Sequence, residues 1–185
     1  MTTYFTGKGD DGTTSILGGG RVSKANLRPQ AYGAVDEASA ALGLARSISS
    51  DDDSHRITLR VQRDLYKLMA ELAASESAAE KFRSIGEDQV NWLELQIERL
   101  GERVVMPKEF IVGGDSQAGA AYDLARTVVR RAERRVVELA DQGMVANPQI
   151  LRYLNRLSTL CFFLLLWENL QAGVDKPRLA ADSDE

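Results

Sequence analysis

Apolar residues recur every three or four positions along five long stretches of the chain, which is the spacing of amphipathic α-helices. The expected helices cover about residues 29–48, 56–75, 86–104, 118–139 and 148–171. Gly101 is expected to end the third of them. Few strands and few internal repeats are indicated. The pattern therefore predicts an all-α fold, a five-helix bundle that carries a glycine-rich N-terminal loop.

The last of these helices has the most apolar segment, LCFFLLLW at residues 160–167. It is apolar on every side, which a helix tolerates only when other helices surround it, so we expect it at the centre of the bundle. The segment lies between Arg156 and Glu168 and is far shorter than the roughly 20 residues of a membrane span. No membrane partner is expected.

The length of 185 residues suits one domain. We expect that domain at residues 1–171, with residues 1–24 as its loop, and an unpacked, flexible tail at residues 172–185. The opening MTTYFTGKG has neither the apolar core of a signal peptide nor an arginine-rich leader, which favours a cytoplasmic protein.

Composition narrows the chemistry further. A net charge of −4 argues against binding nucleic acid over the whole surface, so any anion site must be local. One cysteine, Cys161, and one histidine, His55, exclude a disulfide framework, a structural zinc site and paired Glu-x-x-His di-iron motifs. The inorganic candidates that remain are ions bound by oxygen, such as Mg²⁺.

The stretch TGKGDDGTTSILGGG, residues 6–20, holds six glycines close to the N-terminus. Glycines let backbone N–H groups surround an anion, and Lys8 adds a positive charge, so the segment indicates a phosphate site. Residues 7–12 also spell G-x-G-x-x-G, but a dinucleotide fingerprint needs a strand before it and a helix after it. The sequence indicates neither, and the Walker spacing fails as well. We expect a phosphate loop of neither familiar kind.

The stretch LARTVVRRAERRVVEL, residues 124–139, separates its arginines into two sets. At about 100° per residue, one face carries Arg126, Arg130, Glu133 and Arg134. The core stripe is formed by Ala125, Val128, Val129, Ala132, Val136 and Leu139, and Arg131 and Arg135 flank it. Arginines one turn apart repel each other unless an anion or several carboxylates face them, which favours a triphosphate; the alternative is a solvated face with Glu133 as an ion-pair partner. Nucleic acid is disfavoured, because no aromatic residues alternate with these arginines.

Two polar residues stand where apolar neighbours predict packing. Asn155 lies in the helix that we expect to be buried, so its amide should find a partner, either a functional group or a helix carbonyl. Asp36 is a poor mid-helix residue between Val35 and Ala38, and we expect it to face an arginine.

Five ordered blocks give the chain a resemblance to the PduO-type ATP:cob(I)alamin adenosyltransferases. They are TGKGDDGTTSILGGGRVSK, AYGAVDE, FIVGG, LARTVVRRAERRVV and YLNRLS, and together they span nearly the whole chain. The resemblance implies a homotrimer of five-helix bundles, with ATP and cobalamin bound where subunits meet. It implies transfer of the 5′-deoxyadenosyl group of ATP to the cobalt of a reduced corrinoid, with triphosphate leaving and Mg²⁺ assisting. A reductase and a B12-dependent acceptor enzyme are the further partners it suggests.

The resemblance also assigns roles to residues. The loop positions expected at ATP are Thr6, Gly7, Lys8, Gly9, Asp10, Gly12, Thr13 and Lys24. Asp10 is the candidate for holding Mg²⁺, and an ordinary turn-capping Asp is the alternative. On the helices the expected nucleotide and interface residues are Asp36, Arg126, Arg130, Glu133, Arg134 and Asn155; Arg130 would clamp phosphate, and Asp36 would pair with Arg126 across the interface. Phe110 matches the aromatic residue that presses beneath the corrin and excludes the lower axial ligand of cobalt; an isolated Phe is otherwise most often a core residue.

The chain departs from the family pattern mainly on the corrin side. Val112-Gly113-Gly114-Asp115 replaces Leu-Pro-Gly-Gly, and Tyr122-Asp123 replaces Leu-His. The other replaced positions are Gln30, Ser39 and Thr159. Two hypotheses follow: a working adenosyltransferase, and a non-catalytic relative that binds ATP or a corrinoid as a sensor or carrier.

Overall fold

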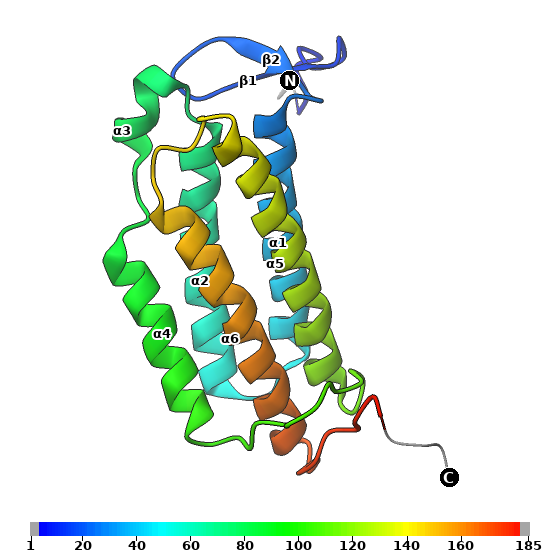
Figure 1. Cartoon of the computed structure of the whole chain (residues 1–185). Coiled ribbons are helices and arrows are strands. Elements are labelled where there is room, and N and C mark those ends of the chain that lie inside the picture. Colours follow the sequence, from blue (N-terminus) through cyan, green and yellow to red (C-terminus); the bar gives the residue numbers. More distant parts are fainter. Residues whose placement is uncertain (1–3, 182–185) are drawn as a thin grey trace.

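Five long helices run along one axis, each close to its predicted range (Figure 1). They are α1 (Leu27–Ile48), α2 (Asp52–Ala73), α4 (Glu87–Gly101), α5 (Gln117–Asp141) and α6 (Gln149–Gln171). The structure is a computed structural model that describes residues 4–181. Within those residues a short α3 (Ala79–Phe82), preceded by a 3₁₀ turn at Glu76–Ala78, raises the number of α-helices to six, where the sequence predicts five. The helical class is confirmed.

Side-chain caps set where several of these helices begin. The Asn26 side chain accepts a hydrogen bond from the backbone N–H of Arg28 (3.0 Å), and Ser116 Oγ accepts one from Gly119 (3.0 Å). Asp51 does the same for α2 by accepting from Ser54 N–H (2.8 Å). This cap explains why α2 begins before its predicted start, since the acidic run that reads as a polar break supplies the cap and first turn.

The core lies between the helices and follows the predicted stripes. All six residues of the expected core stripe of α5 are buried, namely Ala125, Val128, Val129, Ala132, Val136 and Leu139. Helix α6 packs between α4 and α5 (Figure 1). By length and hydropathy α6 is the one described helix that could cross a membrane, but 56% of its apolar window is buried inside the bundle, as in a core helix. Burial raises the pKa of the Cys161 thiol in this helix to about 12.

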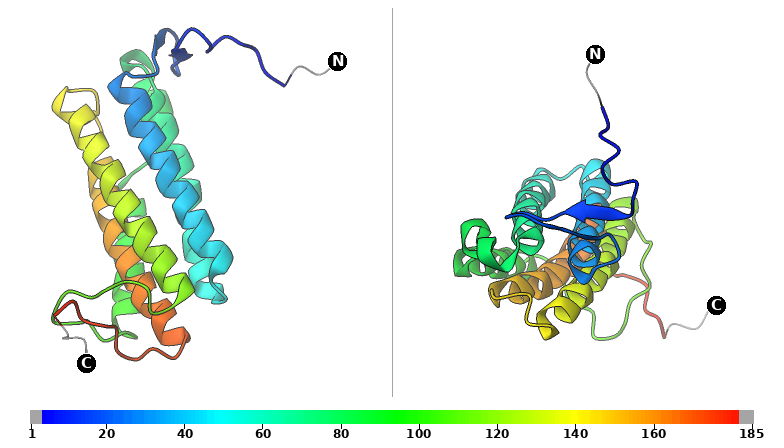
Figure 2. Two further views of the ribbon diagram at one scale, coloured as in Figure 1. Left: turned by 90° about the vertical axis from the view of Figure 1, so that its right-hand side faces the viewer. Right: turned by 90° about the horizontal axis from the view of Figure 1, so that it is seen from above.

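A small β-hairpin covers the end of the bundle at which α1 begins (Figure 2). Its strands are β1 (Thr13–Ser15) and β2 (Arg21–Ser23), paired antiparallel. The hairpin is attached to the end of α2, because Leu17 N–H donates to the Ala73 carbonyl (2.9 Å) and Ser75 N–H donates to the Leu17 carbonyl (2.7 Å). The sequence predicts a loop here. It misses the hairpin because strands of three residues offer too few alternating positions to be recognised.

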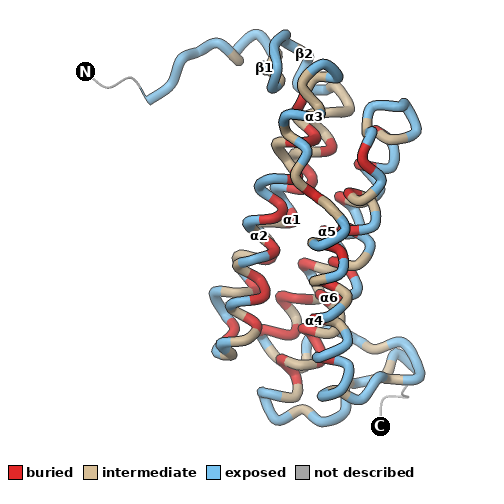
Figure 3. The backbone as a smooth tube through the Cα atoms, turned by 90° about the vertical axis from the view of Figure 1, so that its left-hand side faces the viewer, coloured by how far each residue is buried: buried red, intermediate tan, exposed pale blue. Residues whose placement is uncertain are grey.

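The opposite end of the bundle carries the connection between α4 and α5 and the C-terminal segment (Figure 3). The sequence predicts an unpacked tail from residue 172. In the described part of that tail the structure differs: Ile111 and Leu179 form an antiparallel bridge, and Ala180 N–H donates to the Phe110 carbonyl (2.7 Å). Residues 1–3 of the predicted domain and 182–185 of the predicted tail lie outside the described residues.

Candidate functional site

Side-chain contacts organise the glycine-rich loop from within. The guanidinium of Arg21 donates to Thr13 Oγ1 (3.0 Å from Nε) and to the Lys8 carbonyl, and it forms an ion pair with Asp11 (3.3 Å). Hydrogen bonds from Thr13, followed by the charge of Arg21, lower the pKa of Asp11. Sequence reasoning missed Arg21 and Asp11, although both stand inside the first family block.

Lys24 closes the base of the same loop. Its ammonium donates to the Gly9 carbonyl (2.7 Å), and its backbone N–H donates to the Gly12 carbonyl (2.9 Å). Gly7 and Gly12 have positive φ angles of 67° and 78°, which residues with a side chain rarely adopt. The loop is therefore shaped before any ligand binds.

Two charged side chains project from this loop without partners. Among residues 4–181, neither the ammonium of Lys8 nor the carboxylate of Asp10 has a hydrogen-bond or ion-pair partner, and both residues are exposed. Thr6 Oγ1 accepts a long bond from the Lys8 N–H (3.4 Å). These groups are free to meet a polyphosphate or a cation.

Helix α5 separates its arginines as the helical angles predict. On the α1 side, Arg131 forms an ion pair with Glu37. On the α6 side, the Asn155 amide donates to Glu133 Oε1 (3.0 Å). Arg135 pairs with Glu138 on its own helix.

The other three arginines of α5 form a ladder that we call the arginine ladder, composed of Arg126, Arg130 and Arg134. Arg130 and Arg134 are exposed, and within the described part of the chain neither has an ion-pair partner. Arg126 is half-buried and pairs with Asp123 (2.9 Å). At 1.5 Å per residue the ladder extends about 12 Å along the axis, of which Arg130 and Arg134 occupy about 6 Å.

Two sequence predictions about burial are wrong for the single chain. Asn155 is exposed rather than buried, because α6 is apolar on all sides only in its second half and Asn155 lies in the first. Asp36 is exposed on α1 and has no arginine partner among residues 4–181. The expected pairing of Asp36 with Arg126 is not made within one chain.

Phe110 lies beside Arg126, at the N-terminal end of the arginine ladder. Residues 106–111, together with Asp123, Arg126 and Phe162, line an open cleft of about 390 Å³. The Phe110 side chain is 89% exposed, so it is not the core residue that an isolated Phe usually is. An aromatic side chain held in solvent beside an ion pair suits a large, flat, partly apolar ligand.

Two departures from the family pattern meet at this cleft. A Cβ atom placed on Gly113 would lie 2.5 Å from the Asp123 carboxylate. A side chain at position 113 would therefore require the Asp123 carboxylate to move.

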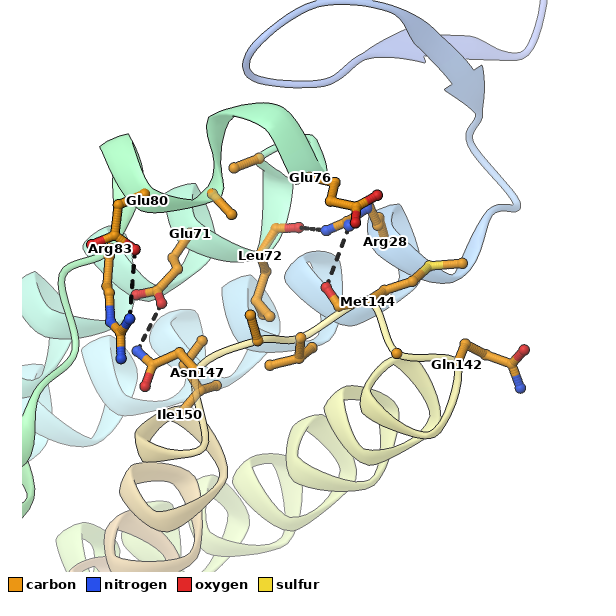
Figure 4. A pocket seen from close by; sticks show the side chains of 15 residues that line it. Arg28, Glu71, Leu72, Glu76, Glu80, Arg83, Gln142, Met144, Asn147 and Ile150 are labelled. Carbon is orange, nitrogen blue, oxygen red and sulfur yellow. Dashed lines mark hydrogen bonds and ion pairs between the residues drawn. The ribbon is translucent and has the colours of Figure 1, made fainter.

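A second cavity, of about 420 Å³, lies at the hairpin end of the bundle (Figure 4). Several of its polar groups are paired with one another: the Asn147 amide donates to Glu71 (2.7 Å), and Arg28 donates to the carbonyls of Leu72 (2.9 Å) and Met144 (3.3 Å). These contacts connect the end of α2, to which the hairpin is attached, with the α5–α6 turn.

The two halves of the predicted ATP site do not meet in one chain. Arg130 lies 11 residues before the end of α5, which is about 16 Å along the axis from the hairpin end. No hydrogen bond or ion pair links residues 4–24 to α5 in the described structure. The loop and the arginine ladder are therefore not in direct polar contact within the described chain.

The described residues contain no group of three or more His, Cys, Asp or Glu side chains that could hold a metal ion alone. Asp10 is an exposed carboxylate of the loop with no hydrogen-bond or ion-pair partner among residues 4–181.

Known proteins resemble this chain over most of its length. Residues 4–168 match the family described as Cobalamin adenosyltransferase. The chain is 40% identical over 169 residues to "Corrinoid adenosyltransferase PduO" of Salmonella typhimurium, covering 91% of this chain and 50% of that protein. It is 34% identical to "Corrinoid adenosyltransferase" of Bacillus subtilis, covering 92% of this chain and 88% of that one. The chain thus spans about half the length of the Salmonella relative.

Solved structures agree with this likeness. A phenylalanine-to-alanine variant of a PduO-type ATP:corrinoid adenosyltransferase from Lactobacillus reuteri, complexed with cobalamin and ATP, matches with a TM-score of 0.90 at 29% identity, over 97% of this chain and 100% of that one. An arginine-to-lysine variant of the same type, complexed with ATP, matches with a TM-score of 0.85 over 95% of this chain and 98% of that one, also at 29% identity.

Proposed function

The chain belongs to the cobalamin adenosyltransferase family, and from that premise we propose that it transfers the 5′-deoxyadenosyl group of ATP to the cobalt of a reduced corrinoid. The products are adenosylcobalamin and triphosphate. A cytoplasmic location is part of the proposal, since ATP is the donor, as are a reductase that supplies Co(I) and a B12-dependent enzyme that accepts the product.

The observation that carries this proposal is the cleft shared by Phe110 and Arg126. It joins an exposed aromatic side chain, suited to a corrin face, to the lower end of the arginine ladder, which is suited to a triphosphate. Arg130 and Arg134 continue that ladder with guanidinium groups that no carboxylate of the described chain neutralises. A flat ligand and a polyanion would therefore lie next to each other.

We propose that the working unit is a homotrimer of five-helix bundles with its sites at the subunit boundaries. The exposed, unpartnered charges support this: Lys8 and Asp10 on the loop, Asp36 on α1, and Arg130 on α5. In a cyclic assembly the loop of one copy lies against the arginine ladder of the next. Asp36 would then meet Arg126 of that copy, if Arg126 exchanges its present partner Asp123.

The proposed reaction is an in-line substitution at C5′ of ATP. The cobalt of the Co(I) corrinoid supplies the electron pair, a Co–C5′ bond forms, the C5′–O bond breaks, and its electron pair leaves on the triphosphate oxygen. Phe110, pressed on the lower face of the corrin, would exclude the lower ligand and so ease reduction to Co(I). Arg130, Lys24 and the loop N–H groups would stabilise the leaving triphosphate and fix its position. Mg²⁺, when bound through Asp10 and phosphate oxygens, would neutralise further charge on the leaving group.

The direct test is turnover. Purified protein with ATP and chemically reduced cobalamin is expected to produce adenosylcobalamin, followed by its visible spectrum and its photolysis by light. Reactions without ATP are the control. The absence of product, with both substrates bound, would refute the proposal.

A mixing experiment tests the shared site. Lys24→Ala removes a loop contact and Arg130→Ala removes the ladder contact, so each variant alone should lose activity. If a site takes its loop from one subunit and its ladder from another, random reassembly into trimers restores about a quarter of the sites. No recovery in verified mixed assemblies would show that both groups serve the same chain.

One observation favours the second candidate, a non-catalytic ATP- or corrinoid-binding relative. Arg126 is already paired with Asp123 at 2.9 Å inside the Phe110 cleft. If that pair persists when ligands bind, the corrin side stays closed to catalysis. Calorimetry that shows ATP binding together with no turnover would favour this candidate.

A further inference from the structure

The C-terminal segment 178–180 is paired with the backbone of Phe110 and Val112, on both sides of Ile111. Ala180 N–H donates to the Phe110 carbonyl (2.7 Å), and Val112 N–H donates to the Arg178 carbonyl (2.9 Å). Between these bonds lies the antiparallel bridge of Ile111 and Leu179. The segment therefore lies along the loop that carries Phe110.

Asp115 fixes the beginning of this pairing. Its carboxylate accepts a hydrogen bond from the backbone N–H of Arg178 (3.1 Å) and lies 3.6 Å from the Arg178 guanidinium. The Asp115 side chain is only 9% exposed, whereas the Arg178 side chain is 85% exposed. The Asp115 carboxylate is therefore held close to the bundle, and its ion pair with the exposed Arg178 guanidinium is open to solvent screening.

The loop needs such a restraint because of its sequence. It has Gly113 and Gly114 in succession, and Gly114 has a φ of 125°. A segment with two glycines and no proline loses more conformational entropy on ordering than one with a proline. Asp115 stands one residue beyond this flexible point, and Phe110 stands three residues before it.

We propose that Asp115 and residues 178–180 form a latch that positions Phe110 over its cleft. They act through the backbone of the loop and do not themselves touch the substrate. The inference rests on the proposed function in one respect, that Phe110 meets the corrinoid. In this chain the carboxylate of Asp115 restrains the loop directly after its two glycines.

The test compares three variants. Asp115→Ala removes the hydrogen bond and the ion pair between Asp115 and Arg178 and leaves the backbone bonds of residues 178–180 to be made without them. Asp115→Asn keeps an oxygen that accepts from Arg178 N–H, and Arg178→Ala keeps the backbone bond while removing the ion pair. Asp175→Ala, an exposed change in the same segment, is the matched control.

Three measurements are made on each variant. Hydrogen exchange at the Val112 and Ala180 amides reports the latch itself. Calorimetry gives the affinity for ATP, and titration with cob(II)alamin in the presence of ATP gives the corrinoid affinity and the visible-spectrum signature of cobalt without its lower ligand.

For Asp115→Ala we expect fast exchange at both amides, about tenfold weaker corrinoid binding and a smaller fraction of cobalt without its lower ligand, with ATP affinity within about twofold. Asp115→Asn, Arg178→Ala and Asp175→Ala should each stay close to the parent protein. Unchanged exchange in Asp115→Ala would show that there is no latch. Faster exchange with an unchanged corrinoid affinity and spectrum would show that the latch does not position Phe110.

These outcomes are separate from those of the proposed function. If the parent protein binds cob(II)alamin but makes no adenosylcobalamin, the proposed transferase activity is refuted. The latch is then still tested by hydrogen exchange at the two amides and by the visible spectrum of the bound cobalt. A parent protein that does not bind the corrinoid at all would overturn the positioning role, because Phe110 would then have nothing to meet.

Discussion

Replacing Gly18 with alanine tests whether the docked hairpin positions the phosphate loop. Gly18 has a φ of 91°, and a Cβ there would lie 2.3 Å from Ala78 Cβ and 2.5 Å from Ser75 Oγ. Carbon atoms in good contact are roughly 3.5 Å apart, so the hairpin and the 3₁₀ turn that follows α2 must separate by about 1 Å. The clash falls beside Leu17, whose two backbone bonds attach the hairpin to α2.

The neighbouring glycine provides the matched control. Gly19 has a φ of 108°, but a Cβ there would meet no atom within 4 Å. Gly19→Ala therefore carries only the conformational cost of a positive φ, on the order of 1–3 kcal/mol and confined to the hairpin tip. Gly18→Ala carries a similar cost together with the displacement.

A displacement of about 1 Å at a binding or catalytic group can reduce rate by about 100-fold. We expect Gly18→Ala to weaken ATP binding by about 10- to 100-fold and to lower kcat/KM in proportion. The melting temperature should fall by a similar amount in both variants, about 2–12 °C for a cost of about 1–3 kcal/mol, because the helical core is untouched. Gly19→Ala should bind ATP within a few-fold of the parent protein.

Isothermal titration with ATP and thermal unfolding by circular dichroism measure these effects. Equal ATP affinities for the two variants would refute the idea that docking on α2 positions the loop. A much larger fall in melting temperature for Gly18→Ala than for Gly19→Ala would instead show that the hairpin stabilises the whole bundle.

Three further predictions concern single residues. Arg130→Ala should abolish measurable ATP binding in calorimetry and, because the side chain is exposed, change the free energy of unfolding by less than about 0.5 kcal/mol. Arg131→Ala, which loses only the Glu37 pair, should keep its ATP affinity. Equal ATP affinities of the two variants would contradict the role of Arg130. Phe110→Ala should leave ATP affinity and melting temperature unchanged but slow adenosylcobalamin formation, and an unaltered rate would remove Phe110 from the mechanism. Burial raises the pKa of Asp64, so the folded protein loses stability as the pH rises through that pKa and the group becomes charged; Asp64→Asn should therefore raise the urea midpoint more at pH 7 than at pH 3, and a gain independent of pH would contradict this.

The helices could be predicted from the sequence because their signals are local and repeated. Each long helix carries several turns of apolar residues, so errors at single positions average out, and the core stripe of α5 is read directly from the helical period. The ends of the helices were predicted less accurately. The early start of α2 depends on one cap, Asp51, whose role is visible only when its bond to Ser54 N–H is seen.

The candidate residues were predicted from ordered sequence blocks, but their surroundings were not. Asn155 and Asp36 were expected in packed surroundings and are exposed, because the position of a residue on its helix does not say which neighbouring helix, or which second chain, covers it. Within the chain Arg126 is paired with Asp123, and the expected pair of Arg126 with Asp36 across a subunit interface stays a prediction.

The sequence by itself determined the helical class, the core stripes and the family, since these depend on periodicity and on residue order along one chain. Only the tertiary structure decided that the hairpin docks on α2, that the Asp123 side chain lies against Gly113, and that residues 178–180 lie along the Phe110 loop. These are contacts between segments far apart in sequence, and their geometry depends on how the helices pack, which no local pattern encodes.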